Sequence, residues 1–257
     1  MLINYDLCFL TPKKKWIFCP TEKSRTIGKL FTQQIVEKWT PPEYFYHFKS
    51  GGHVAAIKAH CRSKYYCKAD ISNFFSSIRK NRIMRDLKRI RFHPKKAQKI
   101  SEWSTVKSKD DPALTILPYG FVQSQIIASV CLDISSVGRY LKSLDTEFTV
   151  SVYVDDIIIS GSNKKRLEAA YAGLLESFQQ SNFKLNIDKS HHPTTKTQAF
   201  NIDISEHDII IEPTRFSDFL KIMDSDNIKV TEAIIGYVST VSKPQAEMLR
   251  QRNKEVY

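Results

Sequence analysis

The chain has 257 residues, of which 42% are hydrophobic, so it can bury the core of one large domain or of a main domain with smaller lobes. Its 39 Lys and Arg against 27 Asp and Glu give a net charge of +12, which favours a polyanionic partner. Five dispersed cysteines without a CxxC pair argue against a disulfide framework, and no apolar run approaches the roughly 20 residues of a membrane span.

The predicted elements begin with two short strands within residues 1–20, on either side of the basic turn Pro12–Lys15. A helix is expected over residues 24–39, because its apolar side chains recur on one face and a Ser or Thr can cap its start. A pair of glycines then breaks the chain before a second helix, from Val54 to about Cys61.

The next segments alternate between strand and helix patterns. An apolar-rich strand is expected to end at Asp70, and an Arg- and Lys-rich helix is expected over roughly 79–105. Residues 108–120 have the composition of a loop, and helical periodicity runs from Ser124 to Leu144.

Residues 148–160 carry two apolar runs around Tyr153–Asp156, which is typical of a β-hairpin. An amphipathic helix is expected over 164–182 and a second hairpin over 198–212, followed by basic helices. Strands that alternate with helices in this way predict a mixed α/β sheet.

Acidic side chains mark the end of one predicted strand and the tip of the first hairpin. Adjacent carboxylates such as Asp155 and Asp156 are costly to hold together unless a cation neutralises them. Carboxylates on neighbouring strands, with Asp70 as the third, suit two divalent cations roughly 4 Å apart. The pattern favours a polymerase metal site, and the alternative is a solvated turn.

Four segments that carry these acids and their neighbours occur in order and at suitable spacing: Asp70–Ile78, Leu117–Ser124, Tyr153–Asp156 and Leu185–Ser190. They resemble the successive palm motifs of reverse transcriptases, particularly those of the bacterial retron, group II intron and abortive-infection (defence-associated) branch. Segments 12–20 and 48–60 are similar to the motifs that precede the palm in this family. The resemblance covers about residues 8–240.

The resemblance implies an α/β (α+β) fold of the right-hand polymerase type. Its fingers are expected within 1–69, and its palm, an antiparallel sheet with packed helices, within 70–212. A fingers insertion is expected at about 79–116, and a short or partial helical thumb over 213–257.

The resemblance also implies which residues carry the chemistry. Asp70, Asp155, Asp156 and Lys189 match the catalytic group, and Asp70, Ile71, Asp155 and Asp156 match a metal site for two Mg²⁺ ions, with Mn²⁺ as a substitute. Lys189 stands where the family has a lysine that protonates the leaving pyrophosphate, a general-acid role. The alternative for Lys189 is an ordinary exposed lysine.

A second group of residues is expected to bind the nucleotide: Lys13, Lys15, Ile71, Asn73, Phe74, Phe75, Tyr119, Gly120 and Gln123. Phe75 matches the aromatic residue that abuts the sugar C2′ and disfavours ribonucleotides; the alternative is a core aromatic. Lys13 and Lys15 would hold the β and γ phosphates, or else belong to a solvated basic turn. Backbone N–H groups near Asn73 and Phe74 would face the triphosphate.

The segment Leu117–Ser124 both fits and departs from the family pattern. Gly120 would let the backbone approach the incoming base and template, as only glycine permits. Tyr119 replaces the usual Gln, and Gln125 replaces the usual Pro. The tyrosine removes an amide and adds a stacking surface, which could alter fidelity, sugar discrimination or dependence on a template.

The implied function is an RNA-directed DNA polymerase that copies a dedicated non-coding RNA in a prokaryotic antiphage defence system, in the bacterial cytoplasm. Its partners would be the RNA template, deoxynucleotides, the DNA product, and a partner protein or second copy that completes the thumb side. No membrane partner is expected. The alternatives are an untemplated or protein-primed DNA polymerase of abortive-infection type and a catalytically silent RNA-binding subunit. A further alternative is an RNA-templated RNA polymerase, against which Phe75 argues.

Overall fold

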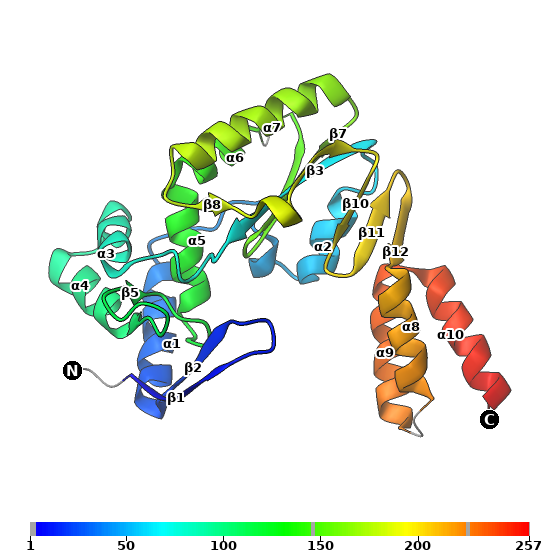
Figure 1. Cartoon of the computed structure of the whole chain (residues 1–257), viewed down its shortest axis with the longest axis horizontal. Helices are drawn as coiled ribbons and strands as arrows, with labels where there is room; N and C mark the ends of the chain where they lie inside the picture. Colours follow the sequence, from blue (N-terminus) through cyan, green and yellow to red (C-terminus); the bar gives the residue numbers. More distant parts are fainter. Residues whose placement is uncertain (1–3, 145–146, 225–226, 257) are drawn as a thin grey trace. The chain divides into compact units, whose positions relative to one another are not determined.

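The structure is a computed structural model that describes residues 4–144, 147–224 and 227–256, as helices and antiparallel sheets that alternate along the chain (Figure 1). The chain divides into two compact units. The first comprises Met1–Glu43, Ile71–Ser143 and Gly173–Asn186, and the second comprises Tyr44–Asp70, Leu144–Ala172 and Ile187–Tyr257. These units cut across the fingers, palm and thumb ranges expected from the sequence, so that three-part division stays a prediction.

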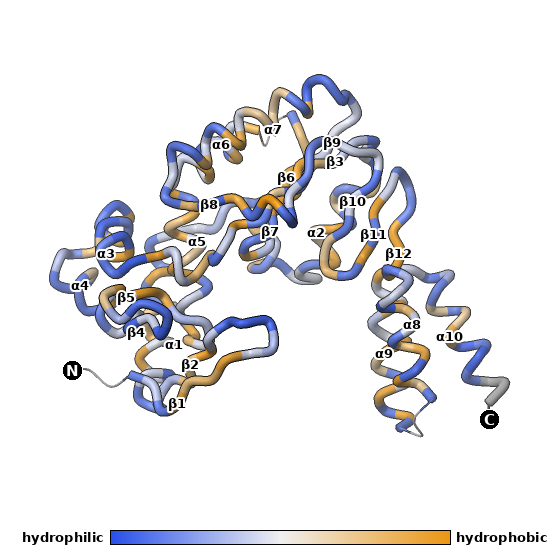
Figure 2. The backbone as a smooth tube through the Cα atoms, in the orientation of Figure 1, coloured by the Kyte–Doolittle hydropathy of each residue, from blue (hydrophilic) through white to orange (hydrophobic). Residues whose placement is uncertain are grey.

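The first unit opens with the predicted hairpin, in which β1 (Tyr5–Leu10) pairs antiparallel with β2 (Trp16–Pro20). The tip of this hairpin is hydrophilic (Figure 2). The predicted helix follows as α1 (Glu22–Val36), capped by Thr21, whose hydroxyl accepts a hydrogen bond from the Ser24 N–H. Both predictions for this segment are confirmed.

The single helix predicted over 79–105 is wrong, because the chain forms α3 (Lys80–Arg89) and α4 (Pro94–Trp103). Between them Arg91 adopts a left-handed φ of 68°, which a continuing helix does not allow, and Pro94 starts the second helix. The predicted loop over 108–120 is interrupted by β5 (Thr115–Ile116), which pairs with β4 (Val106–Lys107).

The helical segment predicted from Ser124 to Leu144 is likewise two helices, α5 (Ser124–Ile134) and α6 (Ser136–Leu144). The break lies at Ser135, whose ψ of 170° is extended. Its hydroxyl accepts a hydrogen bond from the Gly138 N–H at 3.2 Å, so it caps the second helix.

The second unit is built on an antiparallel sheet. Strands β6 (Thr149–Tyr153) and β7 (Asp156–Gly161) form the predicted hairpin, and β7 pairs with β3 (Tyr65–Ser72). On its other edge β3 pairs with β9 (His191–Thr194). The last two residues of β3, Ile71 and Ser72, belong to the first unit, as does β8 (Lys184–Leu185), with which they pair. The predicted adjacency of the two acid-bearing strands is confirmed.

Helices accompany this sheet within the second unit. The predicted helix before β3 is α2 (Gly52–Ala59), which contacts β6, and the 3-10 turn η1 (Tyr46–Phe48) contacts both. The amphipathic helix predicted after the hairpin is α7 (Lys164–Gln179), of which the residues up to Ala172 belong to this unit. A second 3-10 turn, η2 (Ile187–Lys189), precedes β9.

The hairpin predicted over 198–212 is a three-stranded antiparallel sheet of β10 (Lys196–Ala199), β11 (Ile202–Ser205) and β12 (Asp208–Ile211). The pattern in the sequence did not show β10 as a separate strand because its residues are mostly polar. Alternate residues of β11 are buried, so one face of this small sheet joins a hydrophobic core.

The C-terminal segment is helical, as predicted, and consists of α8 (Pro213–Met223), α9 (Ile228–Val241) and α10 (Lys243–Val256). Phe219 of α8 and Val238 of α9 pack into the core that the three-stranded sheet shares. In the ranges that the structure describes, no helix is long and apolar enough to cross a membrane.

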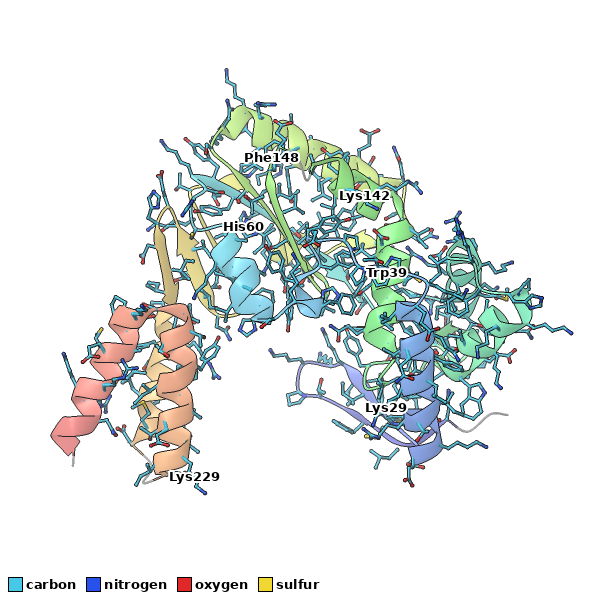
Figure 3. All side chains as sticks on the ribbon, turned by 180° about the vertical axis from the view of Figure 1, so that it is seen from behind. Lys29, Trp39, His60, Lys142, Phe148 and Lys229 are labelled. Atoms are coloured by element: carbon cyan, nitrogen blue, oxygen red, sulfur yellow. The ribbon has the colours of Figure 1, made fainter. Side chains whose placement is uncertain are left out.

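A buried polar network joins the C-terminal end of α2 to β6 and β7 around His60, which is labelled in Figure 3. The His60 ring nitrogens contact the hydroxyl oxygens of Ser160 at 2.6 Å and Ser151 at 2.7 Å, and the Ser160 hydroxyl donates to Ser63. Burial lowers the pKa of His60 to about 3, so the ring is neutral in the folded protein.

This histidine should make the fold sensitive to acid. Unfolded His60 titrates near pH 6.5 and the folded residue only near pH 3, so the unfolded state binds the extra proton between these values. Stability is therefore complete above pH 6.5 and falls by up to about 1.4 kcal/mol per pH unit below it. Urea unfolding of wild type and His60→Asn at pH 7 and 5 checks this; equal losses in both proteins would contradict it.

Candidate functional site

The acids singled out in the sequence lie together at one end of the sheet in the second unit. Asp70 of β3 stands opposite Asp156 of β7 in the strand register, and Asp155 occupies the turn between β6 and β7. The strand pair fixes the spacing of the first two, because directly opposed residues have Cβ atoms about 5 Å apart. The structure therefore brings the three predicted carboxylates to one region.

Lysines neutralise two of these carboxylates. The Lys68 ammonium lies 2.9 Å from an Asp156 oxygen, and the Lys189 ammonium lies 3.8 Å from an Asp70 oxygen. The Asp70 side chain is only 6% exposed, and its backbone N–H donates to the Ser190 hydroxyl at 3.0 Å. Lys189 thus lies beside the acid that the sequence assigned to the same catalytic group.

The carboxylates fit a hard divalent cation by their chemistry, although they do not form a closed cage. Across the described ranges, no three His, Cys, Asp or Glu side chains are close enough to enclose a metal ion. Oxygen donors suit Mg²⁺, which keeps several of its own waters and needs few protein ligands. A buried carboxylate that faces another across a strand pair also needs positive charge beside it, which here comes from lysines.

The turn that carries Asp155 holds a strained residue. Val154 has a φ of 61°, a left-handed conformation that is costly for a β-branched side chain. Its N–H donates to Nδ1 of His47 at 3.1 Å, and His47 packs its ring against Phe48 and Tyr153. The Val152 carbonyl oxygen also lies 3.4 Å from Nδ1; the contact from the Val154 N–H is the shorter of the two and uses Nδ1 of the neutral ring as acceptor.

Burial lowers the pKa of His47 to about 4, in agreement with this neutral ring. A second support comes from the backbone, since the Val152 N–H donates to the Tyr44 carbonyl at 2.7 Å. The segment 44–48 therefore holds the turn in place. Sequence reasoning missed His47, and its only signal was its place just before the 48–60 segment.

Replacing His47 with Phe is expected to lower the free energy of unfolding by about 0.5–1.5 kcal/mol, because the half-buried Val154 N–H loses its acceptor while the ring contacts remain. His47→Gln, whose side-chain oxygen can accept the same bond, should recover part of the loss. Chemical denaturation of both variants checks this. Equal stability of His47→Phe and wild type would show that the bond does not support the turn.

A second group of predicted residues lies together in the first unit. Lys15 donates to the Tyr119 hydroxyl at 3.3 Å, and its ammonium lies 5.0 Å from the centre of the same ring. The Phe75 ring meets Tyr119 edge-on, with 4.6 Å between ring centres. Lys15, Tyr119 and Asn73 line one small cavity of about 50 Å³. Asn73 has a φ of 50°, so the turn after β3 is also strained.

Gly120 fixes where Tyr119 lies. Its φ is 103°, and a Cβ at this position would stand 2.2 Å from the Phe18 carbonyl oxygen. The Phe18 N–H donates to the Tyr119 carbonyl at 3.0 Å, so the two backbones run in contact. A close approach to β2 within the protein thus requires a glycine here, while the predicted approach of Gly120 to base and template stays a prediction.

Of the remaining predicted residues, three have buried side chains and one, Lys13, is exposed but does not line the small cavity. Gln123 is 1% exposed and donates to the Ser104 hydroxyl at 3.2 Å, so its side chain supports α5 and does not face solvent. Phe74 is buried against Phe183, and the apolar side chain of Ile71 is buried as well, which leaves only backbone groups as ligands. Lys13 is exposed in the hairpin turn and does not line the small cavity.

The arrangement of the three carboxylates agrees with the family to which comparison with known proteins assigns the chain. A family model described as "Reverse transcriptase (RNA-dependent DNA polymerase)" matches residues 11–217. The chain therefore belongs to the reverse transcriptase family. No curated protein matches the chain.

Solved structures share the fold. The telomerase of Candida tropicalis, solved with a fragment of telomeric RNA, has 13% identity and a TM-score of 0.57 over 95% of this chain and 52% of its own. The foamy viral protease–reverse transcriptase, solved with double-stranded DNA, has 17% identity and a TM-score of 0.54 over 89% of this chain and 34% of its own. The chain thus has the reverse transcriptase polymerase fold and spans about a third to a half of these proteins.

Proposed function

We propose that this protein is an RNA-directed DNA polymerase that adds deoxynucleotides to a 3′-hydroxyl by two-metal-ion catalysis. The observation that carries the proposal is the opposition of Asp70 and Asp156 across β3 and β7, with Asp155 in the adjoining turn, in a chain of the reverse transcriptase family. The basic composition supports a nucleic-acid partner, because phosphate contacts dominate the affinity of such complexes.

Each acid has a role in this proposal. Asp70 and Asp155 would hold two Mg²⁺ ions, with Asp156 and the backbone of Ile71 as further ligands. Bound Mg²⁺ would activate the attacking hydroxyl and neutralise the charge of the triphosphate. Lys68 would release Asp156 when a cation arrives, and Lys189, beside Asp70, would give a proton to the leaving pyrophosphate.

The nucleotide would be bound by the residues gathered around Tyr119. Lys15 is placed for a phosphate as a point charge, since an ammonium lacks the paired donors of an arginine. Backbone N–H groups at Asn73 and Phe74 would add neutral donors, and Gly120 would keep Tyr119 in position. Lys13 would contribute from the exposed turn.

Phe75 would be the residue that selects deoxynucleotides. Its ring is 9% exposed and fixed against Tyr119, so it offers a rigid wall to the sugar. Phe75→Ala is expected to raise ribonucleotide incorporation relative to deoxynucleotide incorporation by about tenfold or more, the effect of removing a steric contact from a pocket. Single-nucleotide extension checks this, with Phe9→Ala, an exposed phenylalanine of β1, as control. An unchanged ratio would remove Phe75 from this role.

The function is tested by primer extension with and without an RNA template, supplying each deoxynucleotide singly. Templated synthesis predicts incorporation only of the complementary nucleotide. Sequencing the RNA and DNA that copurify with the protein would identify template and product together. Product whose composition ignores the RNA would overturn the proposal.

We propose further that the template is a dedicated non-coding RNA and that the protein acts in prokaryotic antiphage defence, in the bacterial cytoplasm. Support comes only from the resemblance of its motifs to the retron, group II intron and abortive-infection branch. A partner protein or a second copy would complete the thumb side. Plaque assays with wild type and Asp155→Asn test the defence role.

Tyr119 supports a second candidate, an untemplated or protein-primed DNA polymerase. Its hydroxyl and its ring face both engage Lys15, and its ring also engages Phe75, so a bulky aromatic occupies the place where the family has an amide. Tyr119→Gln restores that amide. If the wild-type enzyme extends without RNA and the variant requires it, this second function is the correct one.

A further inference from the structure

A pocket of about 650 Å³ lies entirely within the first unit and includes none of the three catalytic acids. Four basic side chains line it, three from α3 and its start and one from β8: Arg79, Arg82, Arg85 and Lys184. These four basic residues do not line the small cavity beside Lys15, although the two cavities share five other lining residues: Asn73, Ser76, Ser108, Asp110 and Ile116.

The spacing of the arginines follows from the helix. Positions 79, 82 and 85 are three residues apart, so an α-helix presents them on one side. The helix also begins here, with no side-chain cap and no acidic residue in its first turn. Its first N–H groups therefore add partial positive charge near the same arginines.

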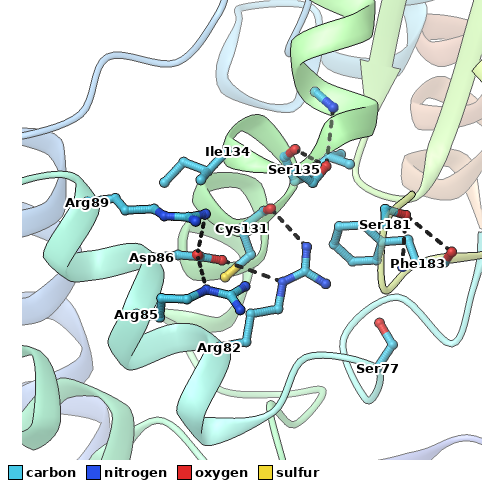
Figure 4. Close-up of polar contacts among 12 residues, drawn as sticks. Ser77, Arg82, Arg85, Asp86, Arg89, Cys131, Ile134, Ser135, Ser181 and Phe183 are labelled. Carbon is cyan, nitrogen blue, oxygen red and sulfur yellow. Dashed lines mark hydrogen bonds and ion pairs between the residues drawn. The ribbon is translucent and has the colours of Figure 1, made fainter. Parts of the chain in front are cut away.

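The arginine charges on α3 are not balanced. Arg82, Arg85 and Arg89 all contact one carboxylate, that of Asp86, at 3.5, 3.1 and 3.3 Å (Figure 4). Three guanidinium charges against one carboxylate leave positive charge uncompensated. Within the described residues, Arg79 and Lys184 form no ion pair that would reduce it.

Arg82 gives the strongest indication of a missing partner. It is only 8% exposed; Nη2 donates to the Cys131 carbonyl at 3.1 Å, and the guanidinium lies 3.9 Å from the Phe183 ring centre. Buried Nη1, however, has no hydrogen-bond partner among the described residues, and Nε reaches only the Asp86 contact. A buried charged donor without a partner is costly, and an anion would satisfy it.

Acidic side chains on the pocket lining limit what can bind. Asp110 accepts a hydrogen bond from the Trp16 indole at 3.1 Å, and Asp111 accepts one from the Ala113 N–H at 3.0 Å. These two carboxylates would repel a polyanion that filled the whole pocket. The volume lies within the range of small-molecule sites.

We propose that this pocket binds a phosphate-bearing small molecule of nucleotide size, with its phosphates against Arg79, Arg82 and Lys184. Guanidinium groups suit this ligand because their paired N–H donors match phosphate oxygens. The phosphates would contact side chains other than Lys15 and Tyr119. Because the two cavities adjoin at Asn73, the Lys15→Gln variant distinguishes this ligand from the nucleotide held beside Tyr119.

Calorimetric titration of Asp155→Asn/Asp156→Asn protein with pyrophosphate and with ATP, in EDTA, tests the proposal without the metal site. Arg79→Gln and Lys184→Gln are each expected to weaken binding about tenfold or more, the effect of losing a charged phosphate contact. Lys88→Gln, exposed on α3 outside the pocket, is the control of equal charge change and should leave binding intact. Lys15→Gln, in the nucleotide group, tests whether the probe binds there instead.

Several outcomes would overturn the proposal. Failure of both probes to bind would do so, as would equal weakening by Lys88→Gln, which would indicate a general charge effect. Equal weakening by Lys15→Gln would place the ligand at the nucleotide residues. Binding of a single-stranded RNA oligomer in place of both probes would assign the arginines to nucleic acid.

Discussion

Asp155→Asn is expected to reduce the rate of DNA synthesis by about 1,000-fold or more. A divalent cation stabilises the transition state by several kcal/mol, and each 1.4 kcal/mol of that stabilisation changes the rate about tenfold. The amide has the same shape as the carboxylate but carries no charge. The turn should keep its fold, because the bond from the Val154 N–H to His47 is untouched. Extension rates at saturating nucleotide measure the loss.

Asp208→Asn is the matched control, because Asp208 is an exposed carboxylate of β12 away from the turn and its change alters the net charge equally. Addition of EDTA to the wild type should give the same loss as Asp155→Asn, and excess Mg²⁺ should reverse it. Full DNA synthesis by the variant would remove Asp155 from the metal site, whereas no synthesis by the wild type would favour a catalytically silent RNA-binding protein.

Gly120→Ala is expected to destabilise the first unit by roughly 2–3 kcal/mol, the cost of a strained φ together with a steric clash. The added Cβ would stand 2.2 Å from the Phe18 carbonyl, so the backbone of Tyr119 must move away from β2. Its contacts with Lys15 and Phe75 would then loosen, and the apparent affinity for deoxynucleotides should fall. Thermal unfolding and nucleotide titration report the two effects separately.

Gly236→Ala serves as the control for this substitution. Gly236 lies inside α9, and nothing stands within 4 Å of the Cβ that an alanine would add. That variant should match or exceed the wild type in stability, by up to about 1 kcal/mol. If Gly120→Ala behaved in the same way, the close approach of the two backbones would not matter.

Local patterns in the sequence predicted most elements of the fold, but not all breaks within them. The Arg-rich stretch over 79–105 keeps helical periodicity on both sides of Arg91, so its left-handed conformation had no clear signal besides Pro94. The extended Ser135 between α5 and α6 was equally hidden, because serine is tolerated within helices.

The part of the candidate site that depends on a recognisable residue pattern could be predicted from the sequence. Paired carboxylates on two strands indicated the acid region, and the register of β3 and β7 confirms that Asp70 and Asp156 are neighbours. The Lys68–Asp156 contact and the His47 acceptor depend on residues far apart in the chain, which single-sequence patterns do not connect. Burial of Gln123 likewise depends on tertiary packing.

The left-handed Val154 has a consequence for selection experiments. Glycine or asparagine would adopt a φ of 61° more easily, so either would relieve strain of about 1 kcal/mol or more. A screen for thermal stability alone should therefore enrich such substitutions. A screen for DNA synthesis should reject those that no longer hold Asp155 in a fixed position. The residue found at position 154 should therefore differ between variants selected for thermal stability and variants selected for DNA synthesis.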